Sequence, residues 1–218
     1  MRYEDSCVNE IFNVYADEHS SAEPLILQEL YRETHLKMLN PRMISGKQQS
    51  HLLRFLCRMK KPLRILEIGT YTGYSAISMA MELPDDGKLF TIEVNEENQQ
   101  IIEKYIQKSQ LENKISLIIG DALQVIPQLN EKWDLVFVDG DKSEYESYFN
   151  LVFDSLNVGG VMVVDNVLWS GKVVNPAEVM NDLPTRLIDS FNKKMATDSR
   201  LEVMLLPIRD GILLIQKK

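Results

Sequence analysis

The chain has 218 residues, of which 44% are hydrophobic and 26% are charged, and its formal net charge is −8. These values are ordinary for a globular protein and exclude disordered and fibrous classes. The length predicts one large domain, or at most two. The excess of negative charge disfavours nonspecific binding to nucleic-acid phosphates.

Cysteine content and hydropathy indicate the compartment. Cys7 and Cys57 form no CxxC pair, so neither a disulfide framework nor a thiolate zinc site is expected, which suits a reducing cytosol. Met1–Asp5 is acidic and lacks the apolar run of a signal peptide. The best apolar run, Val158–Val164, is far shorter than the ~20 residues that a membrane-spanning helix needs. We therefore expect a cytoplasmic protein without a membrane segment.

The first part of the chain has a helical pattern. Ser20–Glu23 and Ser45–Gln48 resemble capping boxes, and they predict helices that run to about Met38 and Met59. No strand is predicted before residue 64. Residues 1–60 are thus expected to form a helical segment packed on the core of a single domain, 1–218, or on a second subunit.

From residue 64 onward, short apolar runs alternate with amphipathic stretches. The predicted strands are nearly continuous apolar runs, as expected for strands covered on both faces: Arg64–Ile68, Lys88–Glu93, Ile115–Ile119, Leu135–Asp139 and Val161–Asp165. Between them, an apolar stripe from Tyr145 to Leu156 and another behind Asn95, a plausible N-cap, predict helices. This alternation predicts an α/β fold with a doubly wound, mostly parallel sheet.

The C-terminal pattern departs from the alternation. Leu201–Ile208 and Gly211–Gln216 are both predicted strands, with only Arg209 and Asp210 between them. Two residues cannot form a parallel crossover, so this pair is predicted to be antiparallel.

The strongest binding motif lies directly after the first predicted strand, in Glu67–Ser75. Gly69 and Gly73 allow a tight strand-to-helix turn and a close approach of a ligand to the backbone. The spacing is not the GxGxxG of dinucleotide-binding proteins, and an acid, Glu67, precedes the first glycine by two residues. A carboxylate there suits a ligand with a cationic amino group.

Two further strand ends carry acids that suit a nucleoside. Glu93 ends the second strand, where a carboxylate can accept both hydroxyls of a ribose. Asp121, followed by Ala122, comes after the third strand and can accept from an adenine amino group. Together they favour S-adenosylmethionine (SAM) over a dinucleotide. The alternative is that the glycines only shape a turn and that the acids are solvated.

A second group of acids suits a divalent cation. Asp139 and Asp165 follow strands expected to be neighbours, about 4.8 Å apart, and Asn166 adds an amide oxygen. Hard oxygen donors without His or Cys suit Mg²⁺ or Ca²⁺. Lys142 lies three residues after Asp139, and a cation beside a dication gives up its proton more readily, as a general base must. Alternatively, the acids merely cap loops and the lysine is solvated.

These residues match a known family. Glu67–Ser75, Val138–Lys142 and Asp165–Asn166 resemble the corresponding motifs of the cation-dependent class I O-methyltransferases, which include caffeoyl-coenzyme A and catechol O-methyltransferases. The likeness covers about residues 40 to 218. It implies a fold of seven strands in which the last is antiparallel. Ser50 and His51 depart from the common pattern, and residues 167–183 correspond to a substrate loop that varies among relatives.

The resemblance also implies roles for individual residues. The methyl donor would be bound by the following: Met43, Glu67, Gly69, Tyr71, Ser75, Glu93, Asp121, Ala122 and Asp139. Asp139, Asp165 and Asn166 would bind Mg²⁺ or another divalent cation, and Lys142 would be the general base, with Asp139 also catalytic. Relatives are often homodimers, and the N-terminal helices would form the contact.

We therefore expect a SAM- and metal-dependent enzyme that methylates a hydroxyl of a small catechol-like or caffeoyl-type acceptor. One alternative is a methyltransferase of the same fold that acts on 5-hydroxyuridine at the tRNA wobble position, which the net charge of −8 disfavours. A nicotinamide-dependent reductase would need the missing GxGxxG motif. A noncatalytic nucleotide-binding module would bind SAM without turnover.

Overall fold

The computed structural model describes residues 4–218 and contains a seven-stranded sheet with the strand order β3-β2-β1-β4-β5-β7-β6. The expectation that the chain has no signal peptide rests on Met1–Asp5. Most of that segment lies outside the described residues. The strands are β1 (Arg64–Ile68), β2 (Lys88–Glu93), β3 (Ile115–Ile119), β4 (Trp133–Val138), β5 (Leu156–Val164), β6 (Leu201–Leu206) and β7 (Ile212–Lys217). The strands predicted from sequence are all present. β1, β2 and β3 have the predicted bounds, and the ends of the other four are shifted.

The pairing of strands agrees with the predicted topology. β1 pairs in parallel with β2 and β4, and β4 pairs in parallel with β5. β7 is antiparallel to both of its neighbours, β5 and β6, and so it alone runs against the rest. The doubly wound sheet with an antiparallel last strand is therefore confirmed.

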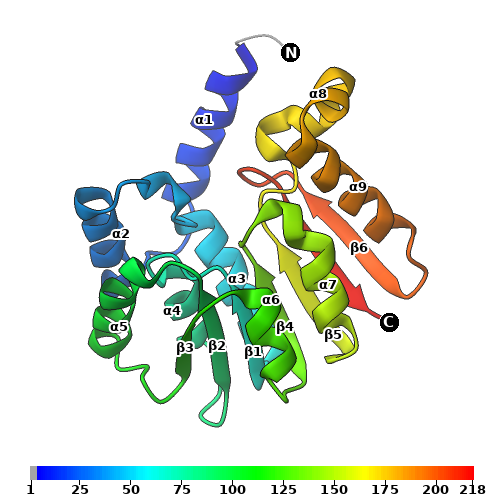
Figure 1. The fold of residues 1–218 in the computed structure, drawn as a ribbon. Helices are drawn as coiled ribbons and strands as arrows, with labels where there is room; N and C mark the ends of the chain where they lie inside the picture. Colours follow the sequence, from blue (N-terminus) through cyan, green and yellow to red (C-terminus); the bar gives the residue numbers. More distant parts are fainter. Residues whose placement is uncertain (1–3) are drawn as a thin grey trace.

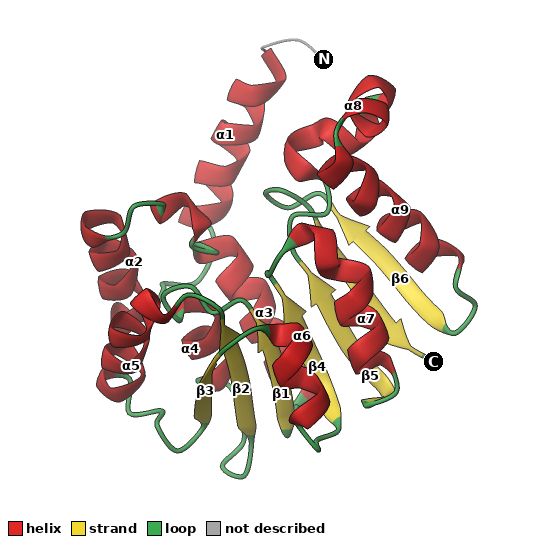
Figure 2. Cartoon of the chain, in the orientation of Figure 1, coloured by secondary structure: helices red, strands yellow, loops and turns green. Residues whose placement is uncertain are grey.

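Helices cover both faces of the sheet (Figures 1 and 2). Alternate residues of each strand point to opposite faces, so Phe137 packs with one set of helices and Val138 with the other. The first set comprises α2 (Leu25–Lys37), α3 (Lys47–Lys60), α4 (Tyr74–Ala80) and α5 (Gln99–Lys108). The second comprises α6 (Ala122–Val125), α7 (Tyr145–Phe153) and α9 (Leu183–Thr197). Strands covered on both faces explain their nearly continuous apolar sequences.

The N-terminal helices differ in how they contact the rest of the chain. α2 and α3 contribute Leu27, Leu30 and Leu53, all fully buried, to the core. α1 (Glu4–Glu18) instead projects away from the sheet (Figure 1). Its side chains Phe12 and Tyr15 remain more than half exposed. The N-terminal segment thus contains two helices, α2 and α3, that form part of the core, and a third, α1, whose apolar surface is uncovered.

Three local predictions were wrong. No serine side chain caps α2 or α3, because Pro24 and Gly46 occupy their N-cap positions. Glu23, predicted to complete the first capping box, instead accepts a hydrogen bond from the Tyr74 hydroxyl. The helical stripe predicted to reach Leu156 ends at Phe153, since Leu156 begins β5 and pairs with Trp133 of β4.

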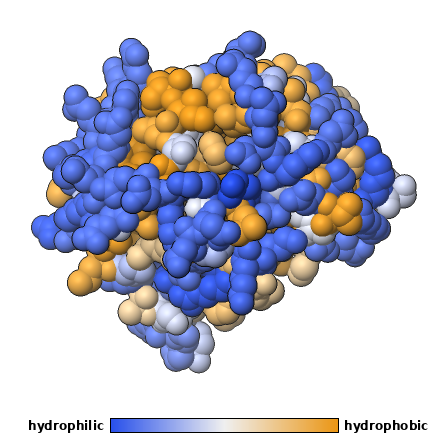
Figure 3. Space-filling view, turned by 90° about the horizontal axis from the view of Figure 1, so that it is seen from below, coloured by the Kyte–Doolittle hydropathy of each residue, from blue (hydrophilic) through white to orange (hydrophobic). Residues whose placement is uncertain are grey.

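The surface agrees with the charged composition. Figure 3 looks from below the view of Figure 1, and hydrophilic residues cover most of that face, with a large hydrophobic area at its top and smaller hydrophobic patches elsewhere. Within residues 4–218, no helix combines the length and the apolarity that crossing a membrane would require.

Candidate active site

A large cleft opens where the parallel strands end. Its volume is about 1040 Å³, and it lies beyond β1 and β4, where the strand order reverses and where sheets of this type bind ligands. The structure brings together at this cleft nearly all of the site residues predicted from sequence: Met43, Gly69, Tyr71, Ser75, Glu93, Asp121, Ala122, Asp139, Lys142, Asp165 and Asn166. Glu67 is the one predicted site residue that does not line it.

The glycine loop forms the floor of one half of the cleft. Gly69 has a φ of +92°, and a Cβ on it would lie 2.3 Å from the carbonyl oxygen of Asp139, so only glycine fits. Gly73, with a φ of +90°, is the N-cap of α4. The loop therefore passes directly beside the end of β4, and this contact joins the two halves of the cleft.

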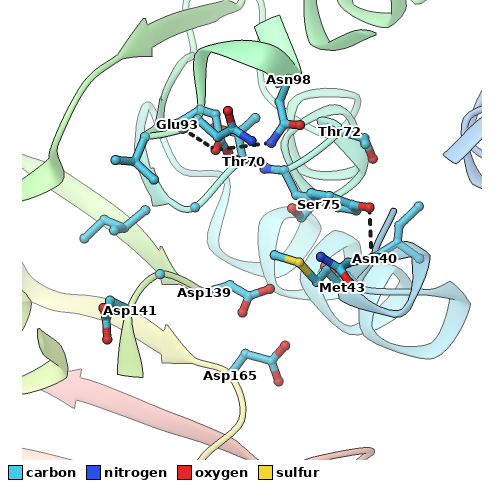
Figure 4. A pocket seen from close by; sticks show the side chains of 18 of the residues that line it. Asn40, Met43, Thr70, Thr72, Ser75, Glu93, Asn98, Asp139, Asp141 and Asp165 are labelled. Atoms are coloured by element: carbon cyan, nitrogen blue, oxygen red, sulfur yellow. Dashed lines mark hydrogen bonds between the residues drawn. The ribbon is translucent and has the colours of Figure 1, made fainter. Parts of the chain in front are cut away.

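Glu93 holds the glycine loop from the neighbouring strand. Its carboxylate accepts hydrogen bonds from the backbone N–H of Tyr71 at 2.7 Å and of Asn95 at 2.9 Å, and from the Asn98 side chain at 3.3 Å. Figure 4 shows Glu93 and Asn98 together at one end of the cleft. A carboxylate has about four lone-pair positions, so it can still accept from a ligand hydroxyl.

Glu67 lies beneath this loop rather than in the cleft. It is fully buried, and the Thr91 hydroxyl donates to its Oε2 at 2.5 Å. Among residues 4–218, its Oε1 has no hydrogen-bond partner. Burial raises the pKa of Glu67 to about 8. Hydrogen bonds from Thr91 and from Ser75, which lines the cleft, oppose this rise.

Asp121 and Ala122 line the far end of the cleft, beyond β3. Asp121 caps α6, because its side chain accepts from the backbone N–H of Leu123 at 2.9 Å. The residue is exposed, whereas Ala122 is buried. One carboxylate oxygen is thus used by the cap, and the other is available to a ligand.

Asp139 and Asp165 form a carboxylate pair at the other end of the cleft. They follow Val138 and Val164, which are partners in the β4–β5 register, and the Asp165 N–H donates to the Val138 carbonyl. Both side chains point into the cavity (Figure 4). Burial, with the nearby charge of Asp165, raises the pKa of Asp139 to about 6 although Lys142 opposes the shift. Burial also raises the pKa of Asp165.

Lys142 lies against this pair. It begins the short 3₁₀ helix η4 (Lys142–Glu144), and its Nζ donates to Asp139 Oδ1 and to the Gly140 carbonyl, each at 3.0 Å. Its side chain is 21% exposed. A largely buried lysine side chain therefore contacts one carboxylate of the pair and borders the cleft.

The chemistry of this corner fits a divalent cation. Within residues 4–218, no three His, Cys, Asp or Glu side chains cluster as a metal site, and here the third oxygen donor is the amide of Asn166. Two adjacent carboxylates with raised pKa values repel each other, and a hard cation between oxygen donors relieves that repulsion. The donor set is one that Mg²⁺ or Ca²⁺ prefers.

Sequence reasoning missed three polar residues at this corner. Gln49, buried in α3, donates from Nε2 to Asp165 Oδ2 at 2.8 Å and accepts from Arg209 at 3.2 Å. Asp210 accepts from the Asn166 amide. Arg209 and Asp210 were considered only as a connection between strands. The turn contains Asp210-Gly211, and Asp-Gly is a common hairpin sequence, so nothing in the sequence marked these residues as part of the site.

Comparison with known proteins agrees with this geometry. A family model described as O-methyltransferase matches residues 17–218. Caffeoyl-CoA O-methyltransferase 5 of Nicotiana tabacum is 36% identical over 205 residues, which cover 89% of this chain and 85% of the relative.

Solved structures with the same fold include two methyltransferases named with their ligands. The SAH-bound methyltransferase PaMTH1 of Podospora anserina has a TM-score of 0.89 and 26% identity, covering 100% of this chain and 98% of its own. The O-methyltransferase TomG of Streptomyces achromogenes, in complex with SAM, has a TM-score of 0.86 and 28% identity, covering 94% and 95%.

The fold and the cleft define a class I methyltransferase. The chain belongs to the O-methyltransferase family, and it is a SAM-dependent O-methyltransferase.

Proposed function

We propose that this enzyme uses a divalent metal ion to methylate a hydroxyl of a small acceptor with two adjacent hydroxyls, of the catechol or caffeoyl type. The observation that carries the proposal is the pair of Asp139 and Asp165 on neighbouring strand ends, with Lys142 in contact with it. The caffeoyl-CoA O-methyltransferases among its relatives support the acceptor class.

We assign the two ends of the cleft to the two substrates. The glycine loop, Met43, Glu93 and Asp121 would bind the methyl donor, and they line the cleft together with the carboxylate pair. Glu93 would accept from the ribose hydroxyls, and Asp121 would accept from the adenine amino group. Glu67 would act on the donor only through the loop above it, because it is buried beneath that loop.

The carboxylate pair and Lys142 would serve the acceptor. A divalent ion held by Asp139, Asp165 and Asn166 would lower the pKa of an acceptor hydroxyl, and it favours acceptors whose adjacent hydroxyls can chelate. Lys142 would remove the hydroxyl proton, since its Nζ lies 3.0 Å from Asp139 at the edge of the cleft. Binding both substrates in one cleft supplies the proximity that the transfer requires.

A methyl-transfer assay tests this function. Labelled SAM is offered with a catechol, a caffeoyl thioester or unmodified and hydroxylated tRNA, each with Mg²⁺ or with EDTA. We expect methylation of the phenolic acceptors with Mg²⁺ only, and its loss in Asp139→Ala. The control Glu202→Gln alters a carboxylate of β6 that is 75% exposed and pairs with Lys218, and should leave turnover unchanged.

Two results would contradict the proposal. Undiminished catechol methylation in EDTA would exclude a metal-dependent mechanism. Methylation of tRNA alone would exclude the small phenolic acceptor and favour the wobble-uridine alternative.

We also infer that the protein forms a homodimer through its N-terminal helices. The apolar side chains Ile11, Phe12 and Tyr15 of α1 are 66%, 64% and 61% exposed, and covering them would be favourable. Analytical ultracentrifugation of the wild type and of Phe12→Ser tests this. A wild-type monomer at micromolar concentration would contradict it.

A further inference from the structure

The turn between β6 and β7 lies beside the carboxylate pair, although it is remote from it in sequence. It is fixed there by backbone hydrogen bonds from Val167 to the Gly211 carbonyl at 3.2 Å and from Leu168 to the Asp210 carbonyl at 2.8 Å. A Cβ on Gly211 would lie 2.5 Å from the Leu168 side chain, so the two segments are in close contact. The turn therefore cannot shift independently of the segment that follows Asp165.

Asp210 uses both of its carboxylate oxygens in this contact. Oδ2 accepts from the side-chain Nδ2 of Asn166 at 3.4 Å, and Oδ1 accepts from the backbone N–H of Ser170. Ser170 has a φ of +55°, between Trp169 at +49° and Gly171 at +77°. Asp210 thus also stabilises three consecutive residues in a strained backbone region.

The contact fixes which end of the Asn166 amide faces the cleft. A carboxylate only accepts hydrogen bonds, so the atom of Asn166 that meets Asp210 must be the NH₂ group. The oxygen of the amide is then directed away from Asp210. Asn166 lines the cleft, and only its oxygen is able to coordinate a cation.

A similar arrangement exists on the other side of the pair. Arg209 only donates hydrogen bonds, so its contact at 3.2 Å requires the Gln49 oxygen, and the Gln49 NH₂ group is left to face Asp165. The backbone N–H of Asn166 donates to the second oxygen of Asp165 at 2.7 Å. Adjacent residues of one turn therefore determine the orientation of both amides beside the carboxylates.

We propose that Asp210 is a positioning residue that sets the orientation of the Asn166 amide, so that its oxygen faces the cation. The inference rests on the proposed metal site, but it concerns a residue outside the ligand set. Residues that hydrogen-bond to metal ligands commonly change metal affinity 10- to 100-fold when they are replaced.

Two substitutions of Asp210 distinguish orientation from simple support of the loop. In Asp210→Asn, the side chain can keep accepting from Ser170 but then presents an NH₂ group to Asn166, which turns the Asn166 amide the wrong way. In Asp210→Ala, both contacts are lost and the Asn166 amide is free. We expect Mn²⁺ binding, measured by titration calorimetry, to weaken at least ~10-fold in Asp210→Asn and less in Asp210→Ala. Loop support alone predicts the opposite order, since Asp210→Ala removes more contacts.

The same Asp210 substitution is also tested in a protein in which Asn166 itself is replaced. Asn166→Asp places a carboxylate at position 166, whose two oxygens are equivalent, so no wrong orientation exists. In that background, Asp210→Asn removes repulsion between two carboxylates and should not weaken Mn²⁺ binding. Thermal unfolding in EDTA and affinity for S-adenosylhomocysteine serve as controls for folding in every variant. If one of the variants does not fold, the Asp210→Ala and Asn166→Asp variants still allow the comparison.

The outcomes separate this inference from the proposed function. If the wild type does not bind Mn²⁺, the metal site itself is wrong, and the inference is overturned with it. If the wild type binds Mn²⁺ but Asp210→Asn weakens binding equally in both backgrounds, or binds no worse than the wild type, only the role of Asp210 is overturned.

Discussion

The backbone of Gly69 is in direct contact with the backbone of Asp139: a Cβ on the glycine would lie 2.3 Å from the aspartate carbonyl oxygen. One residue belongs to the glycine loop after β1 and the other to the carboxylate pair after β4. The spacing between the two proposed substrate regions is therefore set by backbone contact, without an intervening side chain.

Gly69→Ala should destabilise the protein strongly. The substitution combines a positive φ with a clash against backbone atoms that cannot move without displacing β4. Gly171→Ala is the matched control, since Gly171 has a φ of +77° but no atom within 4 Å of its would-be Cβ. We expect urea unfolding to show a loss in Gly69→Ala that exceeds the loss in the control by about 2 kcal/mol or more. Equal losses would show that the clash is relieved locally.

The carboxylate pair should lower the free energy of unfolding when no metal is bound. The pKa of Asp139 is about 6 in the folded protein against an ordinary 3.8, so its contribution is most favourable below pH 3.8 and is lost as the pH rises through 6. At pH 8 in EDTA, Asp139→Asn should therefore melt at a higher temperature than the wild type, and the difference should shrink at pH 5. Differential scanning calorimetry measures this.

Added Mg²⁺ should reverse this order of stability. Ligand binding to the folded state raises the melting temperature, and only the wild type retains both carboxylates. Glu202→Gln, at a side chain of β6 that is 75% exposed, controls for the loss of a charge. A lower melting temperature for Asp139→Asn at pH 8 in EDTA would contradict the repulsion that we infer.

Glu33 should stabilise the attachment of α2 to α5 in a pH-dependent manner. Its carboxylate accepts from Lys104 and from the Tyr105 hydroxyl at 2.7 Å, and hydrogen bonds from Lys104, Lys37 and Tyr105 lower the pKa of Glu33 to about 2. The stabilisation is complete above the ordinary pKa of 4.5 and is lost as the pH falls toward 2. Glu33→Gln should therefore unfold in less urea than the wild type at pH 7, by about 1 kcal/mol, with a smaller difference at pH 3.

A neighbouring pair provides the control for Glu33. Glu29 pairs with Lys108, but both side chains are about half exposed, and such pairs contribute ~0–1 kcal/mol. Glu29→Gln should accordingly change the urea midpoint little at either pH. An equal effect of the two substitutions would indicate a general charge effect rather than the Glu33 network.

Tyr71 should affect the binding of the methyl donor through the loop that contains Met43. The Tyr71 hydroxyl donates to the Asn40 carbonyl at 3.0 Å, directly before the 3₁₀ helix η1 (Pro41–Met43). Tyr71→Phe removes this bond but keeps the ring, so we expect a several-fold higher KM for SAM with little change in kcat. Tyr105→Phe, outside the cleft, controls for the loss of a hydroxyl. A lower kcat with an unchanged KM would contradict a role in donor binding.

The sequence predicted the fold well because the strands carry a strong signal. Strands buried on both faces must be apolar throughout, and β1, β2 and β3 have the predicted bounds. The short connection between β6 and β7 dictated their antiparallel pairing. The ends of β4 and β5 were less clear, since Leu156 continues the apolar stripe of α7 and nothing local marks the change from helix to strand.

The site was predictable where it follows strand ends and unpredictable where it depends on distant contacts. Asp139 and Asp165 were identified because parallel strands bring their carboxyl ends to one edge. Gln49 reaches Asp165 through the packing of α3, over a separation of 116 residues, and Asp210 reaches Asn166 through the β6–β7 turn, over a separation of 44 residues. The position of Glu67 beneath its loop, rather than in the cleft, depends on side-chain packing that no motif records.

The position of β7 bears on the order in which the protein can mature during synthesis. β7 is inserted between β5 and β6, so residues 212–217 must leave the ribosome before β5 acquires its second partner or β6 acquires any. The turn that carries Asp210 also emerges only then, long after Asp139 and Asp165. The nascent chain should consequently form the contact between Asp210 and Asn166 only after the glycine loop has emerged, and termination before residue 212 should leave β5 and β6 with unpaired edges that are prone to aggregation.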